Sequence, residues 1–308
     1  MAKTRVRKAG SKPGIARRPA RRRLKNPVRL KEIRVASVPE YLRAVNSVFQ
    51  SLCSLSQGNN CELWYRGQVR EDFDLLPTIT RKRQGLQLNP LFETVFLSKF
   101  KSLAIPFVEG LPAFPLPGGI TPYWSWLFML RHYGVPARIL DWSRDALTGL
   151  FFATDEEDPS IRPNIDAAVW ILNPVTLNQA FNFHSFLKPG YIPNVEEASF
   201  NTLFGPESKN RNPKPAAAIG PNNTTRIVAQ RGTFTVFPLM KNVVALNKLP
   251  DAGNYLTRIL IDANFFKEIR AQLRHFGVTR LSLYPDLQTI ANEIFQQVLD
   301  EGVNTIDP

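Results

Sequence analysis

The sequence predicts an α+β fold, in which one mixed body of helices and strands follows a disordered, basic N-terminal tail. Two observations lead to this prediction. Hydrophobic residues recur at helical spacing in some segments and as short apolar runs in others, without the regular alternation of a doubly wound sheet. The excess positive charge is confined to the beginning of the chain. We therefore expect a tail at 1–36 and a single domain at 37–308.

Each expected helix has a hydrophobic stripe and a recognisable start or stop. The first follows a capping box that runs from Ser37 to Glu40, with Pro39 in the first turn. Another stops at Gly134, a residue suited to the C-terminal cap of a helix. The helix expected at 144–154 is almost wholly apolar and should lie in the core. The expected helices cover 38–55, 89–100, 122–133, 144–154, 263–276 and 286–299.

The expected strands are short apolar runs, several of them bounded by Gly, Pro or Asn. Residues 185–224 are instead rich in Asn, Pro and Gly, which predicts a long loop or an insertion in the domain. Asp286 is placed to cap the last helix. The expected strands cover 62–67, 137–140, 167–172, 226–229, 233–237, 256–261 and 281–284.

The tail carries the whole net charge of the chain. Residues 1–34 hold 14 basic residues and one acid, whereas the body that follows holds 25 of each. With few large apolar residues, the tail cannot bury enough surface to fold by itself. A flexible cationic arm binds nucleic acid without sequence preference through counterion release; the alternative is a solvated extension with no fixed partner. The residues expected to contact nucleic acid are Arg17, Arg18, Arg21, Arg22, Arg23 and Lys25.

Composition excludes several classes of protein. The 308 residues are 44% hydrophobic, which excludes a wholly disordered chain. No apolar stretch approaches the roughly 20 residues that cross a membrane, and the N-terminus lacks the apolar region of a secretory signal. Two Cys and three His cannot build a structural zinc site or a disulfide framework. We therefore expect no metal, no membrane span and a reducing, cytoplasmic location.

Two segments combine charged and apolar residues in a way that suits a pocket. In WYRGQ at 64–68, an Arg at a strand end beside a Gly suits a phosphate or carboxylate ligand as well as loop carbonyls. In RHYGVPARILDW at 131–142, His, Arg and Asp lie across a turn between apolar helices. The functional interpretation is a polar cluster in which His132 exchanges protons. The structural alternative is an Arg138–Asp141 ion pair, with the His bonded to a carbonyl.

Two later segments are more ambiguous. RIVAQRGTFTVF at 226–237 alternates polar and apolar residues around a Gly, which is typical of an antiparallel strand with a bulge. The same pattern would also place Gln230 toward a ligand. LSLYPDL at 281–287 is typical of a strand-to-helix turn and is interpreted as structural.

Together and in this order, these segments resemble the FRG domain family of bacterial and phage-associated proteins, which is named for an aromatic-Arg-Gly motif. YRGQ at 65–68 looks like that motif, and Arg81 looks like the family's downstream Arg. Residues 131–142 look like the block QHYG-x-P-T-R-LLDW, with Arg and Ala where the family tends to have Gln and Thr. Residues 226–234 are similar to R-x-x-x-Q-x-G-x-F, and residues 277–287 to G-x-x-x-x-LFPDL.

The resemblance implies one polar pocket for a phosphorylated small molecule or nucleotide. A weaker similarity links the context of Arg66 to ADP-ribosyltransferases, in which such an Arg grips the phosphates of NAD. It implies that Arg66 clamps the pyrophosphate and that Asp141 takes the place of a catalytic Glu, since no Gln/Glu-x-Glu tripeptide occurs here. His132 or Gln230 would hold the ribose or the nicotinamide. The other residues expected to contact substrate or cofactor are Tyr65, Gly67, Gln68, Arg81, Tyr133 and Arg138.

Two interpretations of different classes therefore remain. The first is an NAD-dependent ADP-ribosyltransferase that acts on or near nucleic acid. The second is a non-catalytic module that binds a ligand or partner and is held to nucleic acid by its basic tail. A metal-dependent nuclease is disfavoured because the carboxylates are not clustered in the sequence. The transferase interpretation requires Arg66 and residues 131–142 to share one solvent-accessible cavity. In the binding module these motifs would instead be structural buried pairs.

Overall fold

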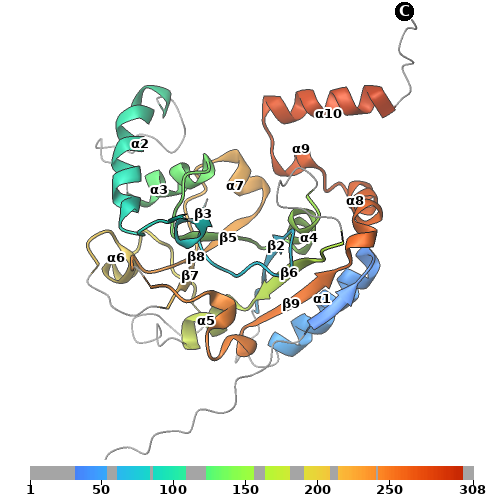
Figure 1. Ribbon diagram of the computed structural model, residues 1–308, viewed down its shortest axis with the longest axis horizontal. Helices are drawn as coiled ribbons and strands as arrows, with labels where there is room; N and C mark the ends of the chain where they lie inside the picture. Colours follow the sequence, from blue (N-terminus) through green and yellow to red (C-terminus); the bar gives the residue numbers. More distant parts are fainter. Residues whose placement is uncertain are drawn as a thin grey trace, which may run out of the picture.

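The protein has a mixed seven-stranded sheet with helices on both faces (Figure 1). This arrangement confirms the predicted α+β class. The basic residues that the sequence predicts as nucleic-acid contacts, at 17–25, lie outside the described residues. The computed structural model describes residues 32–53, 61–83, 86–108, 123–155, 164–180, 191–208, 214–240 and 242–300.

The sheet has the strand order β1-β9-β6-β2-β5-β8-β7. Neighbouring strands run antiparallel, except that β1 is parallel to β9. Two further short strands, β3 and β4, form a separate hairpin. The strands are β1 (Glu32–Val35), β2 (Trp64–Gln68), β3 (Lys82–Arg83), β4 (Leu86–Gln87), β5 (Ile139–Ser143), β6 (Ala167–Leu172), β7 (Ala216–Ala218), β8 (Gly232–Val236) and β9 (Leu256–Ile261).

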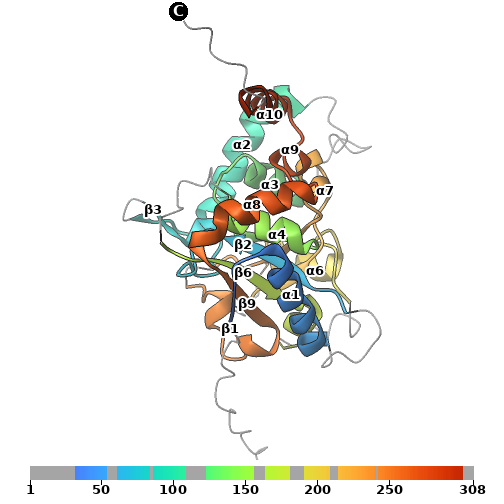
Figure 2. The same ribbon diagram turned by 90° about the vertical axis from the view of Figure 1, so that its right-hand side faces the viewer.

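Helices α1, α4 and α8 cover one face of the sheet, and Figure 2 shows them in front of it. Helices α2, α3, α5 and α6 pack on the other face. Among the helices in the described ranges, none combines the length and apolar composition that a membrane span needs. The helices are α1 (Val38–Cys53), α2 (Phe92–Val108), α3 (Tyr123–His132), α4 (Ala146–Ala153), α5 (Pro174–Ala180), α6 (Ala198–Phe204), α7 (Thr225–Ala229), α8 (Phe266–His275), α9 (Arg280–Leu283) and α10 (Leu287–Asp300).

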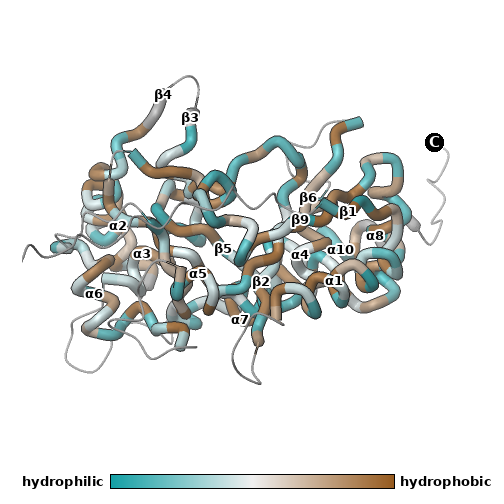
Figure 3. The backbone as a smooth tube through the Cα atoms, turned by 90° about the horizontal axis from the view of Figure 1, so that it is seen from below, coloured by the Kyte–Doolittle hydropathy of each residue, from teal (hydrophilic) through white to brown (hydrophobic). Residues whose placement is uncertain are grey.

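The central strands are buried on both faces, which is why β6 reads as an unbroken apolar run. Alternate residues of β6 enter two different hydrophobic clusters: Trp170 packs on the side of α3, and Val169 packs on the side of α1 and α4. Strands β6 and β9 are among the hydrophobic stretches of the tube in Figure 3. Helices on both faces therefore fix the position of every strand that borders the candidate site.

Helix α4 lies unusually close to β2, because both elements present a glycine at their contact. A Cβ atom on Gly67 would collide with the backbone of Gly149 and Ala153, and would lie 2.7 Å from the carbonyl carbon of Phe152. A Cβ on Gly149 would lie 2.8 Å from that of Tyr65. Backbone therefore packs on backbone here. The Gly of the aromatic-Arg-Gly motif has a packing role that the sequence did not indicate.

Several predicted starts and stops are confirmed. Ser37 accepts a hydrogen bond from the main-chain N–H of Glu40, which is one half of the predicted capping box, whereas the Glu40 carboxylate accepts from the N–H of Ala36 instead of Ser37. Gly134 follows α3 with φ of 81°, a conformation that favours glycine. Asp286 accepts a hydrogen bond from the main-chain N–H of Thr289 and so caps α10.

Two expected strands are instead short helices. Residues 226–229 belong to α7, and residues 281–284 overlap α9. The prediction was wrong because a run of four residues fits either period, whereas side-chain caps decide the outcome. Thr224 accepts a hydrogen bond from the N–H of Ile227, and Thr279 forms a reciprocal capping box with Ser282.

Two predicted boundaries also change. The tail was expected to reach residue 36, but β1 occupies Glu32–Val35 and pairs with β9. The segment at 185–224 was expected as a long loop or an insertion; its described part contains α6 and β7, and β7 forms the edge of the sheet. Pattern reading missed these elements because they are short, and because β1 lies inside the basic segment.

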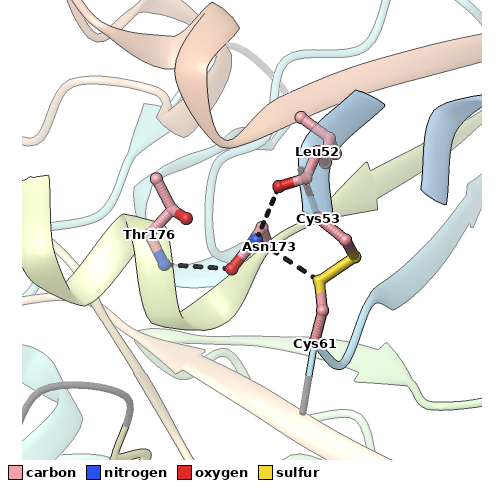
Figure 4. Close-up of a disulfide and its surroundings, with 5 residues drawn as sticks. All are labelled: Leu52, Cys53, Cys61, Asn173 and Thr176. Atoms are coloured by element: carbon pink, nitrogen blue, oxygen red, sulfur yellow. Dashed lines mark hydrogen bonds between the residues drawn. A yellow bond between two sulfur atoms is a disulfide. The ribbon is translucent and has the colours of Figure 1, made fainter. Parts of the chain in front are cut away.

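The two cysteines are bonded to each other (Figure 4). Cys53 ends α1 and Cys61 precedes β2, and the Cα atoms are 5.6 Å apart. Asn173 donates a hydrogen bond to the main-chain oxygen of Leu52, and its own side-chain oxygen accepts one from Thr176. The sequence was expected to support no disulfide framework, and the structure has this single disulfide; the cytoplasmic location stays a prediction. The disulfide ties the end of α1 to the segment that leads into β2.

Substitution of Gly67 by Ala should lower the free energy of unfolding by about 3 kcal/mol, because the methyl group meets immovable backbone. Urea denaturation of the full chain measures this change. Gly232→Ala is the matched control, with an expected loss under about 1 kcal/mol, since its Cβ would first meet a side-chain methyl of Ile227 at 3.1 Å. Equal losses for the two variants would contradict the close approach of α4 to β2.

Candidate functional site

Arg66 lies in β2, between β6 and β5, with its side chain on the same face of the sheet as Trp64. Its Nη1 donates a hydrogen bond to the main-chain oxygen of Asp141 at 2.6 Å. Its Nε is buried and has no hydrogen-bond partner. The side chain is only 14% exposed. Arg66 is thus a fixed cation whose buried Nε donor is unused.

Asp141 lies at the centre of β5, the neighbouring strand. Its Oδ2 is 2.8 Å from Nη2 of Arg131 and 3.9 Å from Nη1 of Arg66. Arg131 comes from the last turn of α3, and its Nε is also buried without a hydrogen-bond partner. The Asp141 side chain nevertheless remains 40% exposed. One accessible carboxylate is therefore shared by guanidinium groups from two different elements.

These groups line one cavity of about 410 Å³, a size typical of small-molecule sites. Arg66, His132 and Asp141 come from separate elements and all contribute to its wall. The charged residues and His of the lining are Arg66, Arg81, Arg131, His132, Asp141, Asp155 and Arg226. The aromatic residues of the lining are Tyr65, Phe73, Phe128, Trp142, Phe152, Phe234 and Tyr284.

A second cationic wall is built from α7 and the end of α9. The guanidinium carbon of Arg226 lies 4.2 Å from the ring centre of Tyr284, and Nη2 donates a hydrogen bond to its hydroxyl oxygen at 3.2 Å. Arg280 lies over the same ring and bonds Asp155 at 3.0 Å. The lining carboxylates therefore face arginines. In the part of the chain that the structure describes, no three His, Cys, Asp or Glu side chains gather as metal ligands.

The pKa values of the site follow from burial and from this concentration of charge. Burial, opposed by Asp141 and reinforced by neighbouring arginines, lowers the pKa of Arg66 to about 9. Burial raises the pKa of Asp141, but the charges of Arg131, Arg66 and Arg226 outweigh it and bring that pKa below its ordinary value. Burial and the charge of Arg226 lower the pKa of His132. At neutral pH the site therefore holds charged arginines, an ionised carboxylate and a neutral imidazole.

Most residues predicted for the pocket line this cavity, although some are also committed to the fold. Gln68 accepts a hydrogen bond from Nε1 of Trp170 at 2.6 Å, and Gln230 donates one to the main-chain oxygen of Leu283 at 3.1 Å. Gly67 packs against α4, as described above. The predicted residues in the lining are Tyr65, Arg66, Gly67, Gln68, Arg81, His132, Asp141 and Gln230.

Arg138 was expected to line the pocket or to pair with Asp141, and both expectations are wrong. Its side chain is 1% exposed, and its Nε lies 2.9 Å from Oε1 of Glu93. Its Nη2 donates hydrogen bonds to the main-chain oxygen of Phe204 and the hydroxyl of Tyr123. The physical reason is the period of an extended chain: residues three apart point to opposite sides of a strand. Arg138 instead forms a buried ion pair beneath α2 and α3.

Tyr133 also lies outside the lining, against expectation. It follows the last residue of α3, is 67% exposed, and its ring lies 6.2 Å from that of Phe100. The next residue, Gly134, does contribute to the lining.

Four residues of the lining that carry charge or a polar ring were not predicted from the sequence: Arg131, Asp155, Arg226 and Tyr284. Arg131 was noted as a departure from a family pattern, and no role was assigned to it. Arg226 and Tyr284 both lie in segments that were singled out, but as a strand and a structural turn. A signal for Arg226 was present in the sequence, because this residue begins the segment of alternating polar and apolar residues that also contains Gln230. Asp155 follows α4 and carried no signal.

The model of the FRG domain family matches residues 61–161. This part of the chain is an FRG domain. The match includes Arg66, Arg131 and Asp141, so the centre of the cavity belongs to the FRG domain. The wall from α7 and α9 lies beyond the matched range yet completes the same cavity. Comparison with curated proteins and with solved structures found no similar chain.

Proposed function

We propose that the cavity of the FRG domain binds a phosphorylated small molecule of nucleotide size. The observation that carries this proposal is the charge of the lining: four arginines against Asp141 and Asp155, of which Asp155 bonds Arg280 outside the lining. The planar guanidinium fork matches phosphate oxygens in two-point contacts. The buried Nε donors of Arg66 and Arg131 have no hydrogen-bond partner, so neither guanidinium is saturated by the residues around it.

The uncharged part of the lining supports a nucleotide rather than a bare phosphate. Seven aromatic residues contribute to the wall, and two that are partly exposed, Phe152 and Tyr284, form an edge-to-face pair at 6.1 Å between ring centres. Flat apolar surfaces of this kind favour stacking with a planar base. A cavity of about 410 Å³ accommodates a ligand of this class.

NAD-dependent ADP-ribosyl transfer is the chemistry that we propose for this site. In that reaction the bond between ribose C1′ and the nicotinamide nitrogen breaks, and nicotinamide leaves with the electron pair. A nucleophile on the target bonds C1′ and loses its proton. Arg66 would hold the pyrophosphate, the ionised Asp141 would favour positive charge at the ribose, and the neutral His132 would accept the proton.

A non-catalytic binding module is the second candidate. It is favoured by the ion pairs of Asp141, because a carboxylate engaged by Arg131 and Arg66 is less free to act on a ribose. Binding without turnover separates this candidate from the transferase.

The proposed organisation is one domain behind a basic tether. The sheet draws its strands from residues 32 to 261, which supports a single domain that begins at β1 rather than at residue 37. Residues 1–31 contain 13 Lys and Arg and no acid. We propose that they bind nucleic acid non-specifically and bring the cavity close to it.

Wild-type protein should bind NAD, and Arg66→Gln should weaken this binding by roughly tenfold to a hundredfold, since a charge-assisted hydrogen bond contributes about 1.5–3 kcal/mol. Calorimetric titration of the full chain measures the affinity. Arg274→Gln, an exposed residue of α8 outside the cavity, is the control and should bind normally. Loss of NAD binding in both variants, or in neither, would contradict the proposed pocket.

The same NAD samples, incubated with nucleic acid and protein targets, report on turnover. The transferase proposal expects nicotinamide release in the wild type and much less in Arg66→Gln, measured by chromatography. NAD that binds without any release would support the non-catalytic module instead.

Deletion of residues 1–31 should weaken binding to generic double-stranded DNA and flatten its dependence on salt, because released counterions contribute a slope of about −0.9 per neutralised phosphate. Fluorescence anisotropy over a series of salt concentrations measures both effects. NAD affinity should not change, since β1 and the cavity are retained. A truncated protein with the wild-type slope would show that the tail is not the tether.

A further inference from the structure

Asp141 is an unusual residue for its place in the fold. It lies at the middle of β5, an interior strand between β2 and β8, where apolar residues are the rule. Its side chain faces the cavity, and its carboxylate is the negative group closest to two of the lining arginines. This position is also where the phosphate of a ligand would have to contact Arg66 and Arg131.

The contacts of the carboxylate leave both guanidinium forks partly unused. Oδ2 of Asp141 meets Nη2 of Arg131 at 2.8 Å, whereas it is 3.9 Å from Nη1 of Arg66, beyond hydrogen-bond distance. The Nε atoms of both arginines are buried and have no hydrogen-bond partner. A carboxylate so placed neutralises charge without saturating the donors around it.

Arg66 does not depend on that carboxylate for its position. Its Nη1 is held at 2.6 Å by the main-chain oxygen of Asp141, a contact that any residue at position 141 would keep. The side chain of Asp141 can therefore leave its partners without releasing Arg66 from the wall of the cavity.

We propose that the Asp141 carboxylate is a resident counter-anion of this cavity, which the phosphate of a ligand displaces from Arg131. This inference rests on the proposed phosphate-binding function and adds a selection rule to it. A ligand must outcompete an anion that is already present, so groups with two or more negative charges are selected over single carboxylates. The resident anion also stabilises the empty site, since the neighbouring guanidinium groups of Arg66 and Arg131 would otherwise repel one another.

The inference predicts that removal of the charge strengthens binding. Asp141→Asn, which is nearly isosteric, should bind inorganic pyrophosphate at least about tenfold more tightly than the wild type, because a like charge about 4 Å from the phosphate position is lost. Calorimetric titration of the full chain with pyrophosphate measures this. Asp72→Asn is the matched control, because Asp72 bonds Arg70 outside the lining and its loss should leave the affinity unchanged.

A second variant keeps the test valid if the first one folds poorly. In Asp141→Ala, acetate should compete with pyrophosphate, because it can occupy the vacated carboxylate position, whereas acetate should have no such effect on the wild type. Thermal unfolding of each variant, with and without pyrophosphate, establishes that the folded protein is being compared.

The outcomes distinguish this inference from the proposed function. Tighter pyrophosphate binding by Asp141→Asn, with competition by acetate in Asp141→Ala, supports the resident anion. Binding by the wild type that is equal or weaker in Asp141→Asn would overturn it, would assign the carboxylate to positioning Arg131, and would leave the phosphate pocket standing. No binding of pyrophosphate or NAD by the wild type or either variant would overturn both.

Discussion

A hydrogen bond from Arg66 to the main-chain oxygen of Asp141 joins β2 to β5 at the centre of the sheet. In the described part of the chain the ladder between these strands is one pair long, Tyr65 with Ser143, so the Arg side chain bridges a position where backbone pairing has ended. The next residue, Gly67, faces the opposite side and lets α4 rest directly on the strand. Adjacent residues of one motif thus place a cation in the cavity and fix the strand that carries it.

The cavity is a site of concentrated positive charge rather than a site of paired acids and bases. Burial and the charges of Arg81 and Arg131 lower the pKa of Arg66. The charges of Arg131, Arg66 and Arg226 lower the pKa of Asp141 and keep it ionised. A group with this environment is suited to hold an anion. The buried pair of Arg138 and Glu93, by contrast, is sealed beneath α2 and α3 and contributes to the fold.

Long periodic elements could be predicted from the sequence, and short ones could not. Helix α1, with its capping box, and strand β6, with six buried residues, were both identified. The runs that became α7 and α9 are too short for periodicity to decide, and threonine caps outside the apolar run settled their conformation. For the site, the proximity of Arg66 to Asp141 was expected. The side of the strand to which the Arg138 side chain points was not, because strand register is a tertiary property.

Arg226 was overlooked because its segment was interpreted as a strand.

A crystal structure of the full chain with bound ADP would show whether the arginines of the cavity bind phosphate. We expect the diphosphate within about 3 Å of the guanidinium groups of Arg66 and Arg131, with the adenine against the aromatic wall of the cavity. Ordered ADP at another surface, with the arginine cluster empty and the Asp141–Arg131 contact intact, would contradict this expectation.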